Sequence, residues 1–164
     1  MKKVAIILAT YNGERYLSEQ LESLRKQTYK NIKVYIHDDG SSDKTLDIIK
    51  KYVEHKRGTI EFELFSKKSL RYPMCFINTL LEIPKADYYA FCDQDDVWNE
   101  DKIEKAVKAI EKFGEESKPS LFYSAVDYYD GNLNYIRNAR FIDRKKPIVA
   151  KYSLQEMLLG GEAM

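Results

Sequence analysis

Apolar residues follow two different periods along this chain, and the two periods alternate. In the first period the stretches are strand-like, and they occupy residues 4–9, 32–37, 60–65 and 86–92. The stretch at 4–9 is a continuous apolar run, which is typical of a strand covered on both faces. In the second period apolar residues recur every three or four positions, as in a helix that buries one face. These stretches are 14–27, about 43–53, 74–83 and a last one marked by Ile103, Val107 and Ile110.

This alternation indicates the fold class. Strands that are each followed by a helix favour an α/β fold, with a mainly parallel sheet and helices on both faces. An aromatic-rich stretch at 121–129 predicts a further strand, and the turn residues at 130–132 predict a late antiparallel hairpin with 133–136. Because 164 residues suit one domain, we expect residues 1–164 to form a single domain.

Charge and cysteine content narrow the classes of function. The 27 basic and 26 acidic side chains nearly cancel, which argues against a nucleic-acid partner. No apolar stretch approaches the ~20 residues of a membrane span, so any membrane contact is expected to be peripheral. Cys75 and Cys92 match no zinc spacing and fit buried free thiols of a cytoplasmic protein. The basic segment 137–151 is interpreted as a solvated loop, with an acceptor or membrane-surface contact as the alternative.

The main candidate for chemistry is the acidic cluster at 93–96, Asp-Gln-Asp-Asp, directly after the strand predicted at 86–92. Three carboxylates at the carboxyl end of a strand suit Mg²⁺ or Mn²⁺, which prefer oxygen ligands and bridge phosphates. The alternative is a solvated loop that caps the helix beginning near Asn99. The neighbouring loops decide between these two interpretations.

Two further polar loops are expected at the same edge, because sites in parallel sheets lie beyond the carboxyl ends of strands. One is 10–13, after the first strand, and the other is 38–41, after the second. In them, Tyr11 can stack on a base and Asp39 can accept a hydrogen bond from a base or a ribose hydroxyl. Together with a carboxylate cluster that holds a metal against a diphosphate, these loops describe a nucleotide-diphosphate site.

Taken in order, the same residues resemble the family 2 glycosyltransferases of the GT-A fold. The matching segments are 4–12 (VAIILATYN), 38–45 (DDGSSDKT) and 91–98 (FCDQDDVW). The third segment is similar to the variant found in the rhamnosyltransferase-like branch. The resemblance covers about the first two thirds of the chain. It implies a Rossmann-like GT-A fold and an inverting enzyme of which this chain is the N-terminal, donor-binding part.

The resemblance also implies a role for each matching residue. Thr10 and Tyr11 would line the nucleoside pocket, and Asp39 would contact the base. Asp95 would be the main ligand of Mn²⁺ or Mg²⁺, with Asp93 near the ribose or the sugar. The full implied nucleotide-sugar-binding set is Thr10, Tyr11, Asn12, Asp39, Arg71, Asp93, Gln94 and Asp95. The implied metal ligands are Asp95 and Asp93, with Asp96 as an additional candidate.

Two departures from the family pattern bear on the substrate and on catalysis. Segment 69–76 replaces a stretch that is rich in small residues in the family, which leaves the donor open between UDP- and dTDP-linked sugars. The general base of inverting members is expected beyond Met164, in an acceptor-binding part that this chain lacks. No catalytic residue is therefore assigned, and we expect poor transfer by these residues alone.

The expected function is a metal-assisted, inverting transfer of a sugar to a saccharide, lipid-linked or protein-glycan acceptor. Family analogy places this activity at the cytoplasmic face of a membrane. One alternative is a non-catalytic nucleotide-sugar-binding or assembly module, and another is a sugar-phosphate nucleotidyltransferase. A homo-oligomer is a candidate assembly in each case. Trp98 is expected to pack against the following helix rather than to floor a sugar pocket.

Overall fold

The computed structural model describes residues 1–54, 58–115, 118–124, 126–130 and 134–138. The chain divides into two compact units, 1–107 and 108–164. The first unit contains a parallel sheet and its helices, and the second contains an antiparallel hairpin. The expectation that 1–164 form one domain stays a prediction.

The first unit has the predicted alternation of strands and helices. The largest difference lies at the first helix, which begins at Leu17 rather than at residue 14. The reason is a turn before it, in which the carbonyl of Gly13 accepts the N–H groups of Tyr16 and Leu17 at 3.0 Å each. The elements are β1 (Val4–Thr10), α1 (Leu17–Arg25), β2 (Ile32–Asp38), α2 (Thr45–Glu54), β3 (Glu61–Ser66), α3 (Met74–Glu82), β4 (Tyr88–Cys92) and α4 (Lys102–Phe113), which continues into the second unit.

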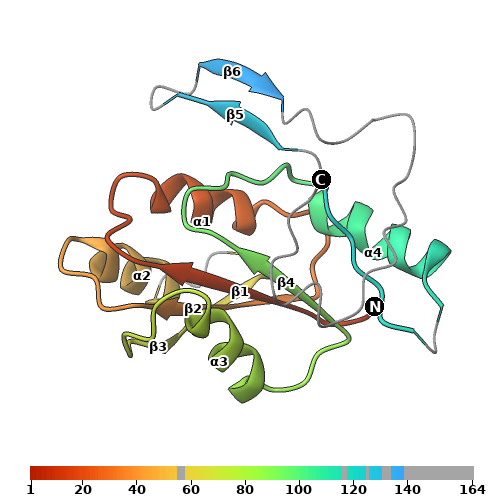
Figure 1. Cartoon of the computed structure of the whole chain (residues 1–164), viewed down its shortest axis with the longest axis horizontal. Coiled ribbons are helices and arrows are strands. Elements are labelled where there is room, and N and C mark those ends of the chain that lie inside the picture. The colour runs from red at the N-terminus through yellow and green to blue at the C-terminus, as the bar shows by residue number, and fades with distance from the viewer. Residues whose placement is uncertain (55–57, 116–117, 125, 131–133, 139–164) are drawn as a thin grey trace. The chain divides into compact units, whose positions relative to one another are not determined.

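The four strands form one parallel sheet in the order β3-β2-β1-β4 (Figure 1). Val4 of β1 lies opposite Ile32 of β2 and Tyr88 of β4, so these strands begin together. At the other edge Thr10 pairs with Asp38. The carboxyl ends of the central strands therefore deliver their loops to one edge of the sheet, as the sequence predicts.

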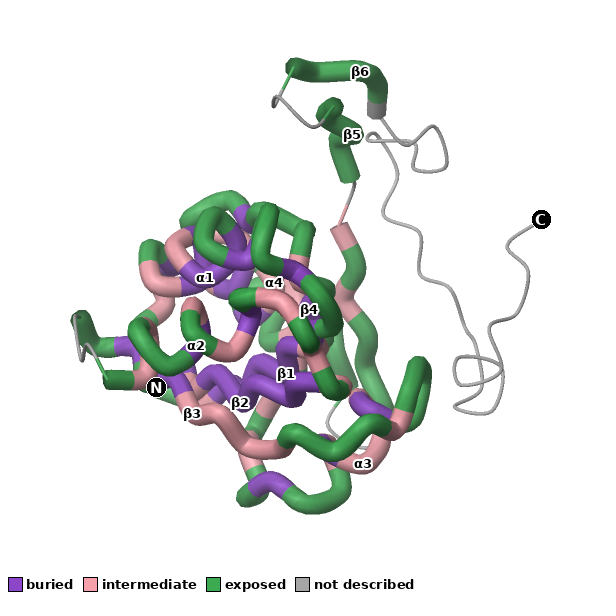
Figure 2. Tube along the Cα trace, turned by 90° about the vertical axis from the view of Figure 1, so that its left-hand side faces the viewer, coloured by how far each residue is buried: buried purple, intermediate pink, exposed green. Residues whose placement is uncertain are grey.

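Helices cover both faces of this sheet, in agreement with the prediction. Figure 1 shows α1 and α2 on one side and α3 on the other, and Figure 2 shows β1 and β2 as the buried centre. Alternate residues of β1 serve the two faces, which is why its whole run is apolar. The larger core joins Val4, Ile6 and Leu8 to Leu17, Leu21, Leu24, Ile49, Ile103 and Val107. The smaller core joins Ala5, Ile7, Tyr35 and Ile83 to Phe76 and Leu80 of α3.

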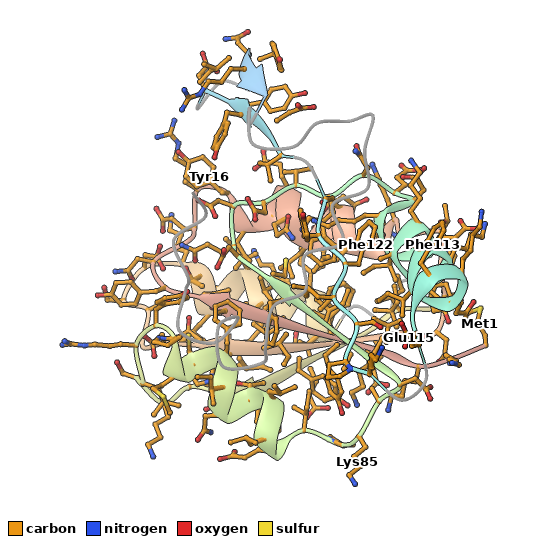
Figure 3. All side chains as sticks on the ribbon, turned by 45° about the vertical axis from the view of Figure 1, so that its right-hand side comes forward. Met1, Tyr16, Lys85, Phe113, Glu115 and Phe122 are labelled. Atoms are coloured by element: carbon orange, nitrogen blue, oxygen red, sulfur yellow. The ribbon has the colours of Figure 1, made fainter. Side chains whose placement is uncertain are left out.

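The second unit contains the rest of α4 and the predicted hairpin. Its strands are β5 (Asp127–Tyr129) and β6 (Tyr135–Asn138), which pair antiparallel. The strand predicted at 121–129 is too long, because residues 121–124 join no ladder in the described part of the chain and β-propensity alone makes no strand. Figure 3 labels Phe113, Glu115 and Phe122 of this unit. Leu133 and most of the basic segment 137–151 lie outside the described residues.

Candidate functional site

Three polar loops gather at the carboxyl edge of the sheet in the first unit. They follow β1 at residues 11–16, β2 at 39–44 and β4 at 93–96, and the last of them is called the acidic loop. Figure 3 labels Tyr16 near this edge, and Met1 and Lys85 near the opposite edge, where β1 and β4 are about to begin. The structure therefore brings the candidate residues of three separate sequence segments to one side of the sheet.

Asp38, the last residue of β2, is a fully buried carboxylate that ties the first two loops together. One of its oxygens accepts the hydroxyls of Thr10 at 3.0 Å and Ser41 at 2.6 Å. Its other oxygen accepts the N–H groups of Gly40 at 3.2 Å and Ser41 at 2.9 Å. Thr10 is itself buried, so its hydroxyl is used in holding this turn. The turn also requires glycine, because Gly40 has a φ of +91°.

Asn12 makes a second connection between the same loops. Its N–H donates to the hydroxyl of Ser41 at 2.9 Å, and its side-chain oxygen accepts the N–H of Ser42 at 2.9 Å. Its φ of +47° lies in the left-handed region, where asparagine is more tolerated than most residues. The side chain of Asn12 is thus engaged within the protein.

Gln94 connects the first loop to the acidic loop. Its side-chain oxygen accepts the N–H of Tyr11 at 2.9 Å, and its side-chain nitrogen donates to the carbonyl of Tyr11 at 3.0 Å. The ring of Tyr11 remains outside this contact, and the residue is 57% exposed. Tyr11 is therefore held by its backbone and presents an exposed ring at the edge of the sheet.

Asp39 organises the segment that leads to α3. Its carboxylate accepts the N–H of Leu70 and, at 3.0 Å, that of Arg71. Arg71 itself has a φ of +59° and is exposed. Asp39 and Arg71, which are 32 residues apart in the sequence, are therefore in contact. His37 lies beside them, buried between the Lys68 carbonyl at 2.9 Å and the Thr79 hydroxyl at 3.2 Å.

The carboxylates of the acidic loop are exposed at its surface, yet the protein beside them removes part of their hydration. This partial burial raises the pKa of Asp93, and the charges of Asp96 and Asp95 raise it further. Partial burial and then the charge of Asp95 also raise the pKa of Asp96, against the opposing effect of Lys102. Closely spaced carboxylates of this kind are stabilised in their ionised form by a cation.

The donor set fits a metal that binds together with a phosphate ligand. Within the described ranges, no group of three or more histidine, cysteine, aspartate or glutamate side chains is arranged to hold a metal ion. Mg²⁺ is commonly held by one or two carboxylates together with substrate phosphates and water. Asp93 and Asp95 are compatible with that pattern, and their role as metal ligands stays a prediction.

Trp98, which follows the acidic loop, is buried as expected. The ammonium group of Lys102, at the start of α4, lies 4.2 Å from the centre of its ring. A groove of about 640 Å³ lies along α1 beside it and does not include the acidic loop. The groove is lined by Ser18, Glu19, Glu22, Ser23, Lys26, Tyr52, Val97, Trp98, Asn99 and Glu100.

Comparison with known proteins decides the family. The model of glycosyl transferase family 2 matches residues 5–160. The chain belongs to glycosyl transferase family 2. Among curated relatives, the UDP-Glc:alpha-D-GlcNAc-diphosphoundecaprenol beta-1,3-glucosyltransferase WfaP of Escherichia coli is 35% identical over 129 residues, which are 79% of this chain and 47% of WfaP. The dTDP-rhamnosyl transferase RfbG of Shigella flexneri is 33% identical over 105 residues, which are 63% of this chain and 36% of RfbG.

Solved structures confirm the expected GT-A-type fold of this family 2 member. TarS 1–349 of S. aureus in complex with UDP aligns with a TM-score of 0.54 at 25% identity, covering 77% of this chain and 41% of TarS 1–349. The mannosyltransferase PcManGT of Pyrobaculum calidifontis, in complex with GDP-Man and Mn²⁺, aligns with a TM-score of 0.59 at 24% identity, covering 66% of this chain and 32% of PcManGT. This chain thus spans less than half of these proteins. The family match does not favour the binding-module or nucleotidyltransferase alternatives.

The sequence analysis overlooked two residues that hold this family 2 site together. Asp38 was expected only as part of the polar loop at 38–41, because the Asp-Asp-Gly-Ser sequence suits a side-chain-stabilised turn but does not tell which of its two aspartates is buried. Thr45, the first residue of α2, accepts the N–H of Gly13 on its hydroxyl oxygen at 2.8 Å. A hydroxyl residue at a helix start is a known capping signal, but its partner in another loop could not be read from the sequence.

Proposed function

We propose that this chain binds a nucleoside diphosphate sugar at the carboxyl edge of the sheet, as the donor site of a family 2 glycosyltransferase. The observation that carries the proposal is the bonded assembly of the three loops, which holds an exposed tyrosine ring and exposed carboxylates at one edge. Such a pair of groups matches the two ends of a nucleotide, an aromatic base and an anionic diphosphate.

The proposed roles follow from which groups are exposed. The ring of Tyr11 stacks on the base, and Asp39, whose carboxylate accepts the N–H groups of Leu70 and Arg71, orients it. Arg71 is placed by that contact to attract the diphosphate. Asp93 and Asp95 hold Mn²⁺ or Mg²⁺, with Asp96 beside them. A bound divalent cation neutralises charge on the leaving nucleoside diphosphate.

The proposed reaction is an inverting transfer to a saccharide, lipid-linked or protein-glycan acceptor. Inversion requires a carboxylate to take the proton of the acceptor hydroxyl on the face of the sugar opposite the diphosphate. We assign that base to no residue of this chain. UDP- and dTDP-linked donors both stay candidates, because WfaP and RfbG are named for different nucleotides at similar identity to this chain.

The proposed location is the cytoplasmic face of a membrane, reached by peripheral contact. No helix among the residues that the structure describes is long and apolar enough to cross a membrane. The basic segment 137–151, which lies mostly outside the described residues, is the proposed contact with anionic lipid or acceptor.

The test is calorimetric titration with UDP, dTDP and GDP, each with and without Mn²⁺. We expect one nucleotide to bind in a metal-dependent way and Asp95→Asn to abolish the metal dependence. Asp101→Asn is the matched control, because it removes one carboxylate that pairs with Lys105 at 2.7 Å outside the three-loop assembly. Nucleotide affinity that is changed neither by Mn²⁺ nor by Asp95→Asn would refute the metal role. Failure of every nucleotide to bind would refute a donor site in this chain.

A further inference from the structure

Gln94 is the one residue of the acidic loop whose side chain contacts the loop after β1 through two hydrogen bonds. Both are made to the backbone of Tyr11, at 2.9 Å to its N–H and 3.0 Å to its carbonyl. A carboxamide can make this pair of hydrogen bonds because its oxygen accepts from a backbone N–H while its NH₂ group donates to the carbonyl of the same residue. A carboxylate in the same place could accept from the N–H but would face the Tyr11 carbonyl without a proton to donate.

Gly13 makes room for this contact. A methyl group at its Cα would lie 2.2 Å from the side-chain oxygen of Gln94 and 2.7 Å from its carboxamide carbon. Gly13 is not among the glycines with a left-handed φ, which are Gly40 and Gly58 in the described chain. The backbone at residue 13 therefore accepts an alanine, and the carboxamide of Gln94 is what excludes it.

We propose that Gln94 is a positioning residue that couples the nucleoside loop, residues 10–13, to the carboxylate loop, residues 93–96. The inference rests on the proposed function and reassigns Gln94 within it. Instead of contacting the nucleotide sugar, its side chain fixes the distance between the Tyr11 ring and the Asp95 carboxylate. That distance must match the span from base to diphosphate if both groups are to bind one nucleotide together.

The remaining contacts make this coupling specific to Gln94. The loops after β1 and β2 are joined by the bonds from Asn12 and Gly13 to Ser41 and Thr45. These bonds do not involve the acidic loop. When Gln94 is truncated, the first two loops stay connected and the acidic loop loses its side-chain bonds to Tyr11.

The first test is a double-mutant cycle on stability with Gly13→Ala, Gln94→Ala and the pair. In the wild-type background the new methyl group expels the Gln94 carboxamide, so Gly13→Ala should lower the urea midpoint about as much as Gln94→Ala does. In the Gln94→Ala background the space is free. Gly13→Ala should then be neutral or raise the midpoint, because alanine restricts the unfolded chain.

Gly40→Ala is the matched control for this cycle. Its penalty comes from a φ of +91° and not from Gln94, so it should cost the same in both backgrounds. Equal effects of Gly13→Ala with and without Gln94 would overturn the contact, and with it the proposal.

The second test separates positioning from ligand contact. With the nucleotide that binds, UDP or dTDP, Gln94→Ala and Gly13→Ala should each reduce the affinity gained on adding Mn²⁺ by about tenfold, the size expected from losing two neutral hydrogen bonds. Affinity for the corresponding nucleoside monophosphate should change less than about twofold, because the pocket of the first two loops is intact. A loss of the same size for both ligands would overturn the coupling.

Nucleotide sugars supply the last comparison. If Gln94 contacted the sugar, Gln94→Ala would weaken binding of the nucleotide sugar but not of the free nucleoside diphosphate. Gly13→Ala would then not reproduce this difference. Failure of every nucleotide to bind the wild-type chain would overturn the proposed function and the coupling of ligand sites with it. An additive stability cycle would overturn the role of Gln94 but leave the proposed donor site untouched, so the two failures are distinguishable.

Discussion

Replacing Asp38 with alanine should be strongly destabilising, although this residue is not expected to touch a ligand. The carboxylate is fully buried and accepts four hydrogen bonds, from the hydroxyls of Thr10 and Ser41 and from the N–H groups of Gly40 and Ser41. Alanine removes both acceptor oxygens, and with them all four hydrogen bonds, at once. The hydroxyls can turn to other partners, but the two N–H groups point into a turn that was built around the lost oxygen.

The magnitude follows from the cost of unpaired groups. Hydrogen bonds to an ionised group contribute about 1.5–3 kcal/mol each, and part of that is recovered when hydroxyls find other partners. We expect Asp38→Ala to lower the free energy of unfolding by about 3–5 kcal/mol, a large share of the 5–15 kcal/mol typical of a folded domain. Asp38→Asn should cost only about 1 kcal/mol. Its oxygen can accept the N–H groups while its nitrogen donates to the two hydroxyl oxygens.

Urea unfolding followed by circular dichroism measures both variants. With a typical slope of about 2 kcal/mol per molar, Asp38→Ala should move the midpoint down by about 2 M without changing the slope. Asp47→Ala is the control, because that carboxylate is exposed on α2 and lies 3.9 Å from Lys50, so its loss should cost less than about 0.5 kcal/mol. A cost of less than about 1 kcal/mol for Asp38→Ala, or equal damage by asparagine and alanine, would show that these hydrogen bonds do not hold the turn.

Two further predictions concern a buried tyrosine and the two buried cysteines. The hydroxyl of Tyr35 is buried with no hydrogen-bond partner among the described residues, so Tyr35→Phe should leave stability unchanged or raise it by up to about 1 kcal/mol in the same urea assay. A loss of 1 kcal/mol or more would contradict this. Burial raises the pKa of the Cys75 and Cys92 thiols, so both should stay protonated and unreactive towards a disulfide reagent in the native chain at pH 8 and react after unfolding. Because folding favours the protonated thiols, their contribution to stability is constant below about pH 9 and declines as the pH rises above it. Rapid labelling of the native chain would show that a thiol is accessible.

Strand and helix positions could be predicted closely because burial imposes a simple pattern. β1 is covered on both faces, so six consecutive apolar residues at 4–9 leave little doubt about its place. The strand predicted at 121–129 is too long because a ladder needs a partner, which no local pattern reports, and only 127–129 have one among the described residues. The start of α1 was predicted three residues too early, because residues 14–16 form a turn whose backbone hydrogen bonds to Gly13 lead directly into the helix.

The candidate site could be predicted as a set of loops but not as a set of contacts. Residues of the three motifs do lie at one edge, because topology alone brings the ends of parallel strands together. Which side chains face a ligand depends on pairings across the fold, such as that of Gln94 with Tyr11, 83 residues apart. Spacing along the chain carries no information about such a pairing.

The motif residues therefore divide into two groups with different expected phenotypes. The first group uses its side-chain polar atoms in hydrogen bonds within the protein, and it contains Asp38, Asn12 and Gln94. Substitution of these residues should therefore lower stability together with any loss of binding. Tyr11 and Asp95 expose theirs, so their substitution should weaken nucleotide binding while leaving the urea midpoint nearly unchanged. Conservation within a motif would not tell these groups apart, because both are needed for the same site. Stability and nucleotide affinity measured on the same variants would separate the two groups. A variant of Asp95 that unfolded as easily as Asp38→Ala would show that the acidic loop also supports the fold.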